Sequence, residues 1–62
     1  MAMQIIRFVV YDKGGPVAEG AVWSDGDVAL HWRGGKNTLF KSRAALESDI
    51  GRNHKIVYDR AV

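Results

Sequence analysis

Few side chains in this sequence can perform chemistry near neutral pH. The chain has two histidines, His31 and His54, and no cysteine. Histidine is the side chain whose ordinary pKa lies closest to neutrality, so acid–base or metal chemistry would have to involve these two residues. Their separation lacks the short spacing between ligands that a structural zinc site requires. We therefore expect two surface histidines, no metal site and no cofactor.

Two serines that could be considered as nucleophiles have simpler structural explanations. Ser24 precedes Asp25 in a sequence typical of a hairpin turn, and Ser42 precedes a predicted helix, where serine is a favoured N-cap residue. Neither serine has a base predicted beside it. A small sheet also offers little room for a concave pocket that excludes water. We predict no catalytic residue and expect that this protein is not an enzyme.

Two pairs of glycines raise the question of phosphate binding. Gly14-Gly15 and Gly34-Gly35 match neither a Walker loop nor a dinucleotide fingerprint, both of which need defined spacings before a helix. Connections between strands explain both pairs better.

The basic residues near these glycines are the basis for a nucleic-acid hypothesis. The chain carries 9 Lys and Arg against 7 Asp and Glu, a formal net charge of +2, which is a weak field for a protein that neutralises many phosphates. In an up-and-down meander the first and third connections lie at the same end of the sheet, which would gather Lys13, Arg33 and Lys36. We favour two solvated loop ends over a phosphate-binding tip, and keep these three residues as candidate nucleic-acid contacts.

The elements that position these residues follow from composition and alternation. Hydrophobic residues make up 47% of the 62 residues and charged residues 26%, which indicates one small globular domain over residues 1–62. β-Branched and aromatic runs predict strands, and Leu46 and Ile50 give a short helix its apolar stripe. The expected strands cover residues 4–11, 17–24, 27–32, 38–40 and 55–58, and the helix covers residues 43–50. The predicted class is α+β, an antiparallel meander in the order β-β-β-β-α-β.

Asp25-Gly26 predicts the register of the central hairpin. This pair is favoured in a two-residue type I′ turn, which would place Trp23 opposite Val28. The predicted core face consists of Val17, Ala21, Trp23, Val28, Leu30 and Trp32. The reverse face is small and weakly polar, and it is our candidate protein interface, made of Ala18, Gly20, Val22, Ala29 and His31.

One short helix can cover only one face of such a sheet. The second face must be exposed to solvent, curled into an SH3-like barrel, or covered by another chain. A chain of 62 residues buries only about 60% of its unfolded surface, so a partner that completes the core would add much to its stability. We therefore expect either a barrel-like sheet or an open sheet with a patch for a protein partner or a second copy.

Several segments resemble a group of short proteins of actinobacteria and their phages. The segments are Val17-Ala18-Glu19-Gly20, Ser24-Asp25-Gly26, Val28-Ala29-Leu30 and Trp32, followed by a short helix that ends near a glycine and by a final apolar strand. The resemblance extends from Val17 to Tyr58, with a shorter first connection and with His31 where the group has arginine. It implies a small intracellular or phage-encoded accessory protein and implies no particular activity.

The sequence therefore predicts a non-enzymatic protein that binds an unknown protein partner or a second copy of itself through a sheet face or edge. A small nucleic-acid-binding module that uses the basic loops is the alternative, which the weak net charge disfavours. No apolar run reaches the roughly 18 residues that span a bilayer, and the segment from Met1 to Ile6 lacks the features of a signal peptide. We expect a cytoplasmic protein with no membrane partner.

Overall fold

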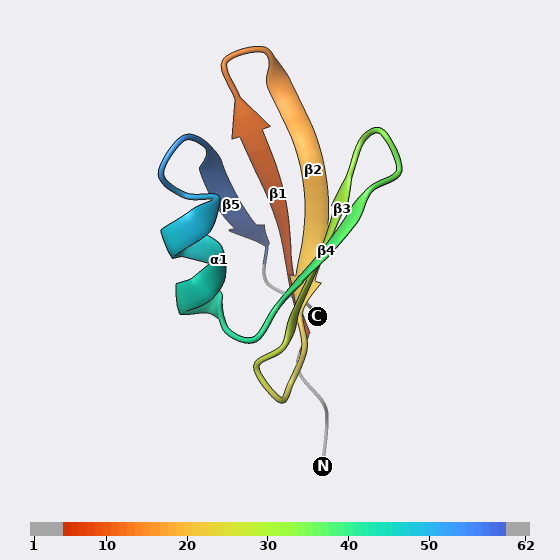
Figure 1. Ribbon diagram of the computed structural model, residues 1–62, viewed down its shortest axis with the longest axis vertical. Coiled ribbons are helices and arrows are strands. Elements are labelled where there is room, and N and C mark those ends of the chain that lie inside the picture. Colours follow the sequence, from red (N-terminus) through yellow and green to blue (C-terminus); the bar gives the residue numbers. More distant parts are fainter. Residues whose placement is uncertain (1–4, 60–62) are drawn as a thin grey trace.

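The computed structural model describes residues 5–59, which form five strands and one helix (Figure 1). Their bounds are β1 Ile6–Asp12, β2 Gly15–Val22, β3 Val28–Trp32, β4 Asn37–Phe40, α1 Arg43–Asp49 and β5 Lys55–Asp59. All pairings between neighbouring strands are antiparallel. The predicted α+β class and the order β-β-β-β-α-β are confirmed. Gln4, the first residue of the predicted first strand, lies outside the described residues.

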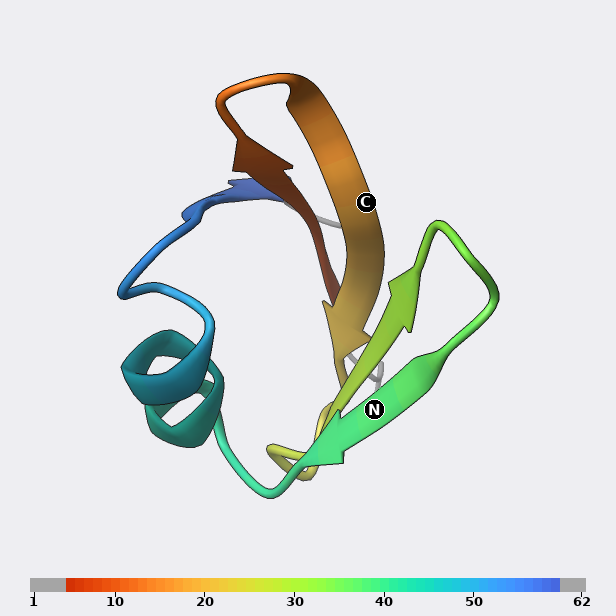
Figure 2. The same ribbon diagram turned by 45° about the horizontal axis from the view of Figure 1, so that its top comes forward.

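The strands form one sheet in the order β4-β3-β2-β1-β5, so that β4 and β5 are its two edges. The described strands show no pairing between β4 and β5, and the sheet is therefore open rather than closed into a barrel. Figure 2 shows that the sheet is strongly curved and that α1 lies on its concave side. Of the alternatives expected from the sequence, the open sheet is the one observed.

The core lies between the concave face of the sheet and α1. Phe8 and Val10, alternate residues of β1, are almost completely buried there, because alternate side chains of a strand point to the same face of the sheet. Leu46 and Ile50 from the helical segment pack on the same core, because residues four apart lie on one side of a helix. The buried hydrophobic residues are Phe8, Val10, Ala18, Val22, Val28, Leu30, Leu46 and Ile50.

The β2–β3 hairpin differs from the prediction in its register. Val22 pairs with Val28, and the Trp23 N–H donates to the Asp27 carbonyl at 2.7 Å, which leaves a loop of three residues between them. Gly26 is the residue of this loop that adopts a positive φ, 98°, whereas a type I′ turn needs two such residues. The predicted two-residue turn is therefore wrong.

Because of the additional loop residue, the face of β2 that is buried is the opposite of the predicted one. A shift of one residue exchanges the two faces of a strand, because successive side chains point to opposite sides of the sheet. Ala18 and Val22 accordingly face the core with 4% and 5% exposure, while Trp23 is 44% exposed. The prediction that Ala21 and Trp23 belong to the core is wrong, whereas the core positions predicted on β3 are correct.

Ser42 begins the helix as predicted. Its Oγ accepts a hydrogen bond from the backbone N–H of Ala45 at 3.1 Å, which satisfies one of the free donors of the first turn. The helix ends at Asp49, one residue before the predicted end, with Ile50 as its C-cap. In the described part of the chain, this helical structure is neither long nor apolar enough to cross a membrane.

Tyr58 attaches α1 to the edge strand β5. Its hydroxyl donates a hydrogen bond to Oε2 of Glu47, and the guanidinium of Arg43 lies 4.3 Å from the centre of its ring. The ring also meets Phe8 of the core edge to face, with 5.8 Å between the ring centres. Burial, and then the hydrogen bond to Glu47, raise the pKa of the Tyr58 phenol above its ordinary value.

Trp32 of β3 contacts both β4 and the segment between α1 and β5. Its indole N–H donates to Oγ1 of Thr38 at 3.1 Å, and its ring lies edge to face with His54, 6.0 Å between centres. Nδ1 of His54 is also 3.3 Å from the carbonyl oxygen of Ile50. His54 is therefore half-buried between the helix end and β3 rather than on the open surface that the sequence predicts.

Candidate functional site

The convex face of the sheet is the side opposite α1 (Figure 2). It consists of alternate residues of all five strands, which line up in two rows across the sheet. The first row contains Asn37, His31, Glu19, Val9 and Val57. The second row contains Leu39, Ala29, Ala21, Arg7 and Asp59. These two rows define what we call the convex face.

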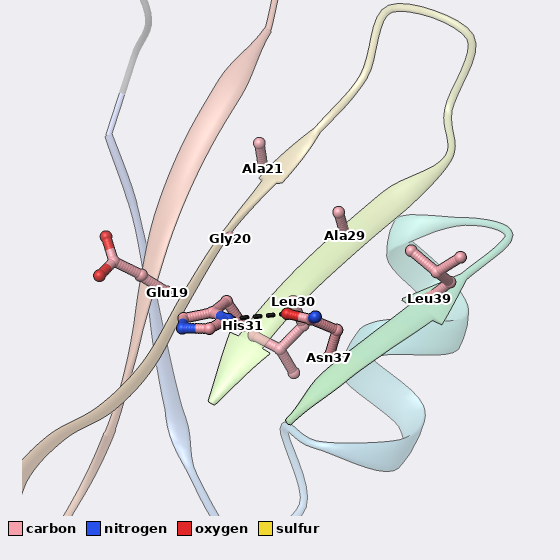
Figure 3. Close-up of a pocket in the computed structure, with 8 residues that line it drawn as sticks. All are labelled: Glu19, Gly20, Ala21, Ala29, Leu30, His31, Asn37 and Leu39. Carbon is pink, nitrogen blue, oxygen red and sulfur yellow. Dashed lines mark hydrogen bonds between the residues drawn. The ribbon is translucent and has the colours of Figure 1, made fainter. Parts of the chain in front are cut away.

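An open hollow of about 600 Å³ lies on the convex face over β2, β3 and β4 (Figure 3). Ala21 of β2 and Ala29 of β3 are paired across the two strands and form its floor, since their methyl side chains are short. Leu39 stands on one side with 80% of its surface exposed, and Glu19 and His31 stand on the other. An apolar floor with a polar rim is typical of the surfaces through which proteins bind one another.

His31 is held in one orientation on this rim. Its Nδ1 lies 2.7 Å from Oδ1 of Asn37, as the dashed line in Figure 3 marks. Because the amide oxygen accepts, the imidazole donates this hydrogen bond from Nδ1. Glu19 is the cross-strand neighbour of His31, so an imidazole and a carboxylate lie side by side. The rim can therefore both donate and accept hydrogen bonds.

The two histidines do not come together in the structure. His31 lies on the convex face, whereas His54 packs against Trp32 on the concave side. Within residues 5–59, no group of three or more His, Cys, Asp or Glu side chains is arranged to hold a metal ion. Nothing in the described geometry therefore points to a metal centre at the hollow.

The predicted protein interface lies only partly on the convex face. Ala29 and His31 are there, whereas Ala18 and Val22 are buried in the core. Gly20 also turns towards the core, where a Cβ atom would lie 2.6 Å from a phenylalanine ring of β1. The prediction is therefore wrong for Ala18 and Val22, because the register of the hairpin differs by one residue, whereas the backbone of Gly20 does line the hollow (Figure 3).

The sequence interpretation missed the side of the hollow that β4 provides. Leu39 and Asn37 border the hollow, and neither belonged to a predicted site. Alternation within this strand contains the missing signal: Thr38 and Phe40 are partly buried, and the residue between them must point to the other face.

The three candidate nucleic-acid contacts lie at one end of the molecule. Lys13 is in the β1–β2 loop, while Arg33 and Lys36 are in the β3–β4 loop, and Figure 1 shows both loops at the upper end. The two loops diverge in both Figure 1 and Figure 2. A second hollow of about 290 Å³, beside the first, is lined by Arg33 and Tyr11 but by neither lysine. The topology therefore gathers the three residues without combining them in one hollow.

Comparison with known proteins identifies a family. A model of the Acb5 phage protein family matches residues 13–54. The match begins in the β1–β2 loop and ends just before β5, so it includes β2, β3, β4 and α1 and more than half of the chain. No curated protein and no solved structure gives a significant match. The phage association implied by the sequence resemblance is confirmed, and the chain belongs to the Acb5 phage protein family.

Proposed function

We propose that this chain is a small phage accessory protein that binds another protein through the convex face of its sheet and catalyses no reaction. The observation that carries the proposal is the uneven covering of the sheet. The helix of the described chain lies on the concave side, which leaves the hollow of the convex face open to solvent. A curved sheet with one bare and partly apolar face is suited to a protein partner.

The edges of the convex face supply the apolar surface for such a contact. Leu39 on β4 is 80% exposed, and Val57 on β5 is 42% exposed. Fully burying a side chain of this kind contributes about 1.5–3 kcal/mol, before the cost of association is subtracted. The short side chains of Ala21 and Ala29 between them allow a partner to approach the backbone closely.

The polar residues of the same rows supply specificity. His31 and Asn37 present an oriented hydrogen-bonding pair, and Arg7 faces Asp59 across β1 and β5. Charged and polar groups at the rim of an interface select the partner and its orientation more than they add affinity. A complementary partner would therefore carry an apolar projection for the hollow and polar groups around it.

The test is site-specific photocross-linking during phage infection. A photoreactive amino acid that replaces Ala29 would lie in the hollow. The same amino acid in place of Ser48, which is exposed on α1, is the matched control. We expect a distinct cross-linked protein from the first position only, and its loss when Ala21→Arg fills the hollow. Identical products from both positions, or none from Ala29, would show that the proposal is wrong.

The setting of this activity is also a proposal. The resemblance to proteins of actinobacteria and their phages supports an actinobacterial host, and the composition supports action in its cytoplasm. Both points can be tested by infecting a host strain with a phage that encodes a tagged copy of the protein and then fractionating the cells.

Nucleic-acid binding is the second candidate function. The observation in its favour is the position of Lys13, Arg33 and Lys36 on two loops at one end of the molecule. Fluorescence polarisation with short DNA and RNA should then show binding that weakens with salt, with a slope that falls by about one for each phosphate contact removed. Changing the three residues to glutamine should remove binding, whereas Lys41→Gln at the opposite end should not. The absence of binding at low salt would exclude this function.

A further inference from the structure

β4 is an edge strand without the usual protection against pairing. It bonds to β3 on one side, and no strand of the described chain lies on its other side. Its four residues, Asn37–Phe40, include no charge and no proline. Monomeric proteins commonly protect such edges with charged residues, proline or a bulge. The opposite edge, β5, carries a charge at each end, Lys55 and Asp59.

The backbone of β4 has hydrogen-bonding groups that point away from the sheet. The Trp32 N–H donates to the carbonyl of Lys36 at 2.7 Å, so these two residues form a hydrogen-bonded pair of the ladder. Such pairs alternate along antiparallel strands, and Thr38 and Phe40 therefore direct their backbone groups towards β3. The N–H and carbonyl of Leu39 point outward, where another strand could bond to them.

Exposed apolar side chains lie along the same edge. Trp23, 44% exposed, and Leu39, 80% exposed, both line a hollow of about 530 Å³ that also includes Phe40. An outward-facing backbone and large apolar side chains at one place are the two components of strand-to-strand association.

We propose that the occupant of this edge is β4 of a second copy of the chain, paired antiparallel about a two-fold axis at Leu39. The two sheets would then continue into one another. An arrangement of this symmetry closes on itself and leaves no free β4 edge. The inference rests on the proposed function, since it takes the sheet as an interaction surface, and it names the partner at one edge.

The charges at the two ends of β4 favour this orientation. Asp25 and Asp27 lie in the turn near its C-terminal end, and Arg33 and Lys36 lie in the loop before its N-terminal end. Antiparallel pairing sets the acidic end of one copy beside the basic end of the other, whereas parallel pairing would set like charges together. Lys41 reduces the negative charge at the acidic end without reversing it.

The register follows from the outward-facing residue. Leu39 of one copy would form a hydrogen-bonded pair with Leu39 of the other, and both side chains would lie on the convex face about 5 Å apart. Each leucine would thereby lose much of its exposure to solvent. The convex faces of the two copies would form one continuous surface.

Size-exclusion chromatography with light scattering on the full chain tests the proposal. The wild type should have twice the 6.9 kDa mass of one chain. Leu39→Lys and Leu39→Glu should each have the mass of one chain, because like charges then face each other across the axis. An equimolar mixture of the two variants should restore the dimer, because the opposed charges then differ in sign.

Val57→Lys is the matched control, since it places a charge on the convex face at the opposite edge. It should remain a dimer, and circular dichroism should show that every variant is folded. A wild type with the mass of one chain, a dimer broken by Val57→Lys but not by Leu39→Lys, or a mixture that stays monomeric would each overturn the pairing. A monomeric wild type that still gives a specific cross-link from Ala29 would overturn the dimer alone. A dimer without such a cross-link to another protein would overturn the proposed function alone.

Discussion

At the scale of single residues, Gly20 determines how closely β2 approaches the core. A Cβ atom there would lie 2.6 Å from Cζ of Phe8 and still closer to the carbonyl oxygen of Ala29. Real Cβ atoms do not make such contacts, and the backbone oxygen cannot move without disturbing the ladder. Glycine at this position is therefore a requirement of packing rather than of backbone conformation, because its φ is not positive.

We expect Gly20→Ala to lower the free energy of unfolding by about 1–3 kcal/mol, the usual cost of overfilling a packed core. Ala21→Val, in the next position, should change it by less than about 0.5 kcal/mol, since the added methyl groups face the open hollow. Urea unfolding followed by tryptophan fluorescence measures both. A larger loss of stability for Ala21→Val than for Gly20→Ala would support the two-residue turn, which puts Ala21 in the core.

At the scale of elements, Tyr58 connects α1 to β5, and its ionisation should couple this contact to pH. Its pKa is raised above the ordinary 10.0, chiefly by burial, so the folded chain holds the phenolic proton more tightly than the unfolded chain. Raising the pH through 10.0 therefore favours the unfolded state, and stability present at lower pH is lost as the pH rises towards the folded pKa.

Tyr58→Phe should lower the free energy of unfolding by about 1 kcal/mol at neutral pH, because this variant lacks the hydrogen bond to Glu47. Above pH 10.0 its stability should fall less steeply than that of the wild type. All other side chains are the same in the two proteins, so the difference between their urea midpoints, measured as a function of pH, isolates the contribution of the phenol. Parallel curves would contradict the burial of Tyr58.

At the scale of the whole molecule, the open sheet leaves a small domain with limited core. Among residues 5–59, eight hydrophobic residues form the buried set, and one seven-residue helix covers the sheet. A chain of this size has marginal stability on its own. A second copy bound at β4 would stabilise the folded state by mass action.

The melting temperature of the wild type should therefore rise with protein concentration. The melting temperature of Leu39→Lys should not depend on protein concentration, because this variant forms no dimer that could dissociate. Differential scanning fluorimetry over a wide concentration range makes the comparison, with Val57→Lys as the control that should behave like the wild type. A wild-type melting temperature independent of concentration would contradict the dimer.

Local features of this protein follow from its amino-acid sequence alone. The apolar pattern of residues 4–11 correctly predicts a strand where β1 lies, and Ser42 correctly predicts the start of the helix. The order of the elements and the α+β class also follow from the sequence. These features depend on neighbouring residues in the chain, so local physical preferences are enough to determine them.

The buried face of β2 and the open edges of the sheet, in contrast, are established by the three-dimensional structure. Asp25-Gly26 is compatible with loops of two or three residues, and that one residue decides whether Val22 or Trp23 faces the core. The exposure of Leu39 is likewise a consequence of the edge position of β4. Faces and edges depend on contacts between distant segments, and a short-range pattern does not contain that information.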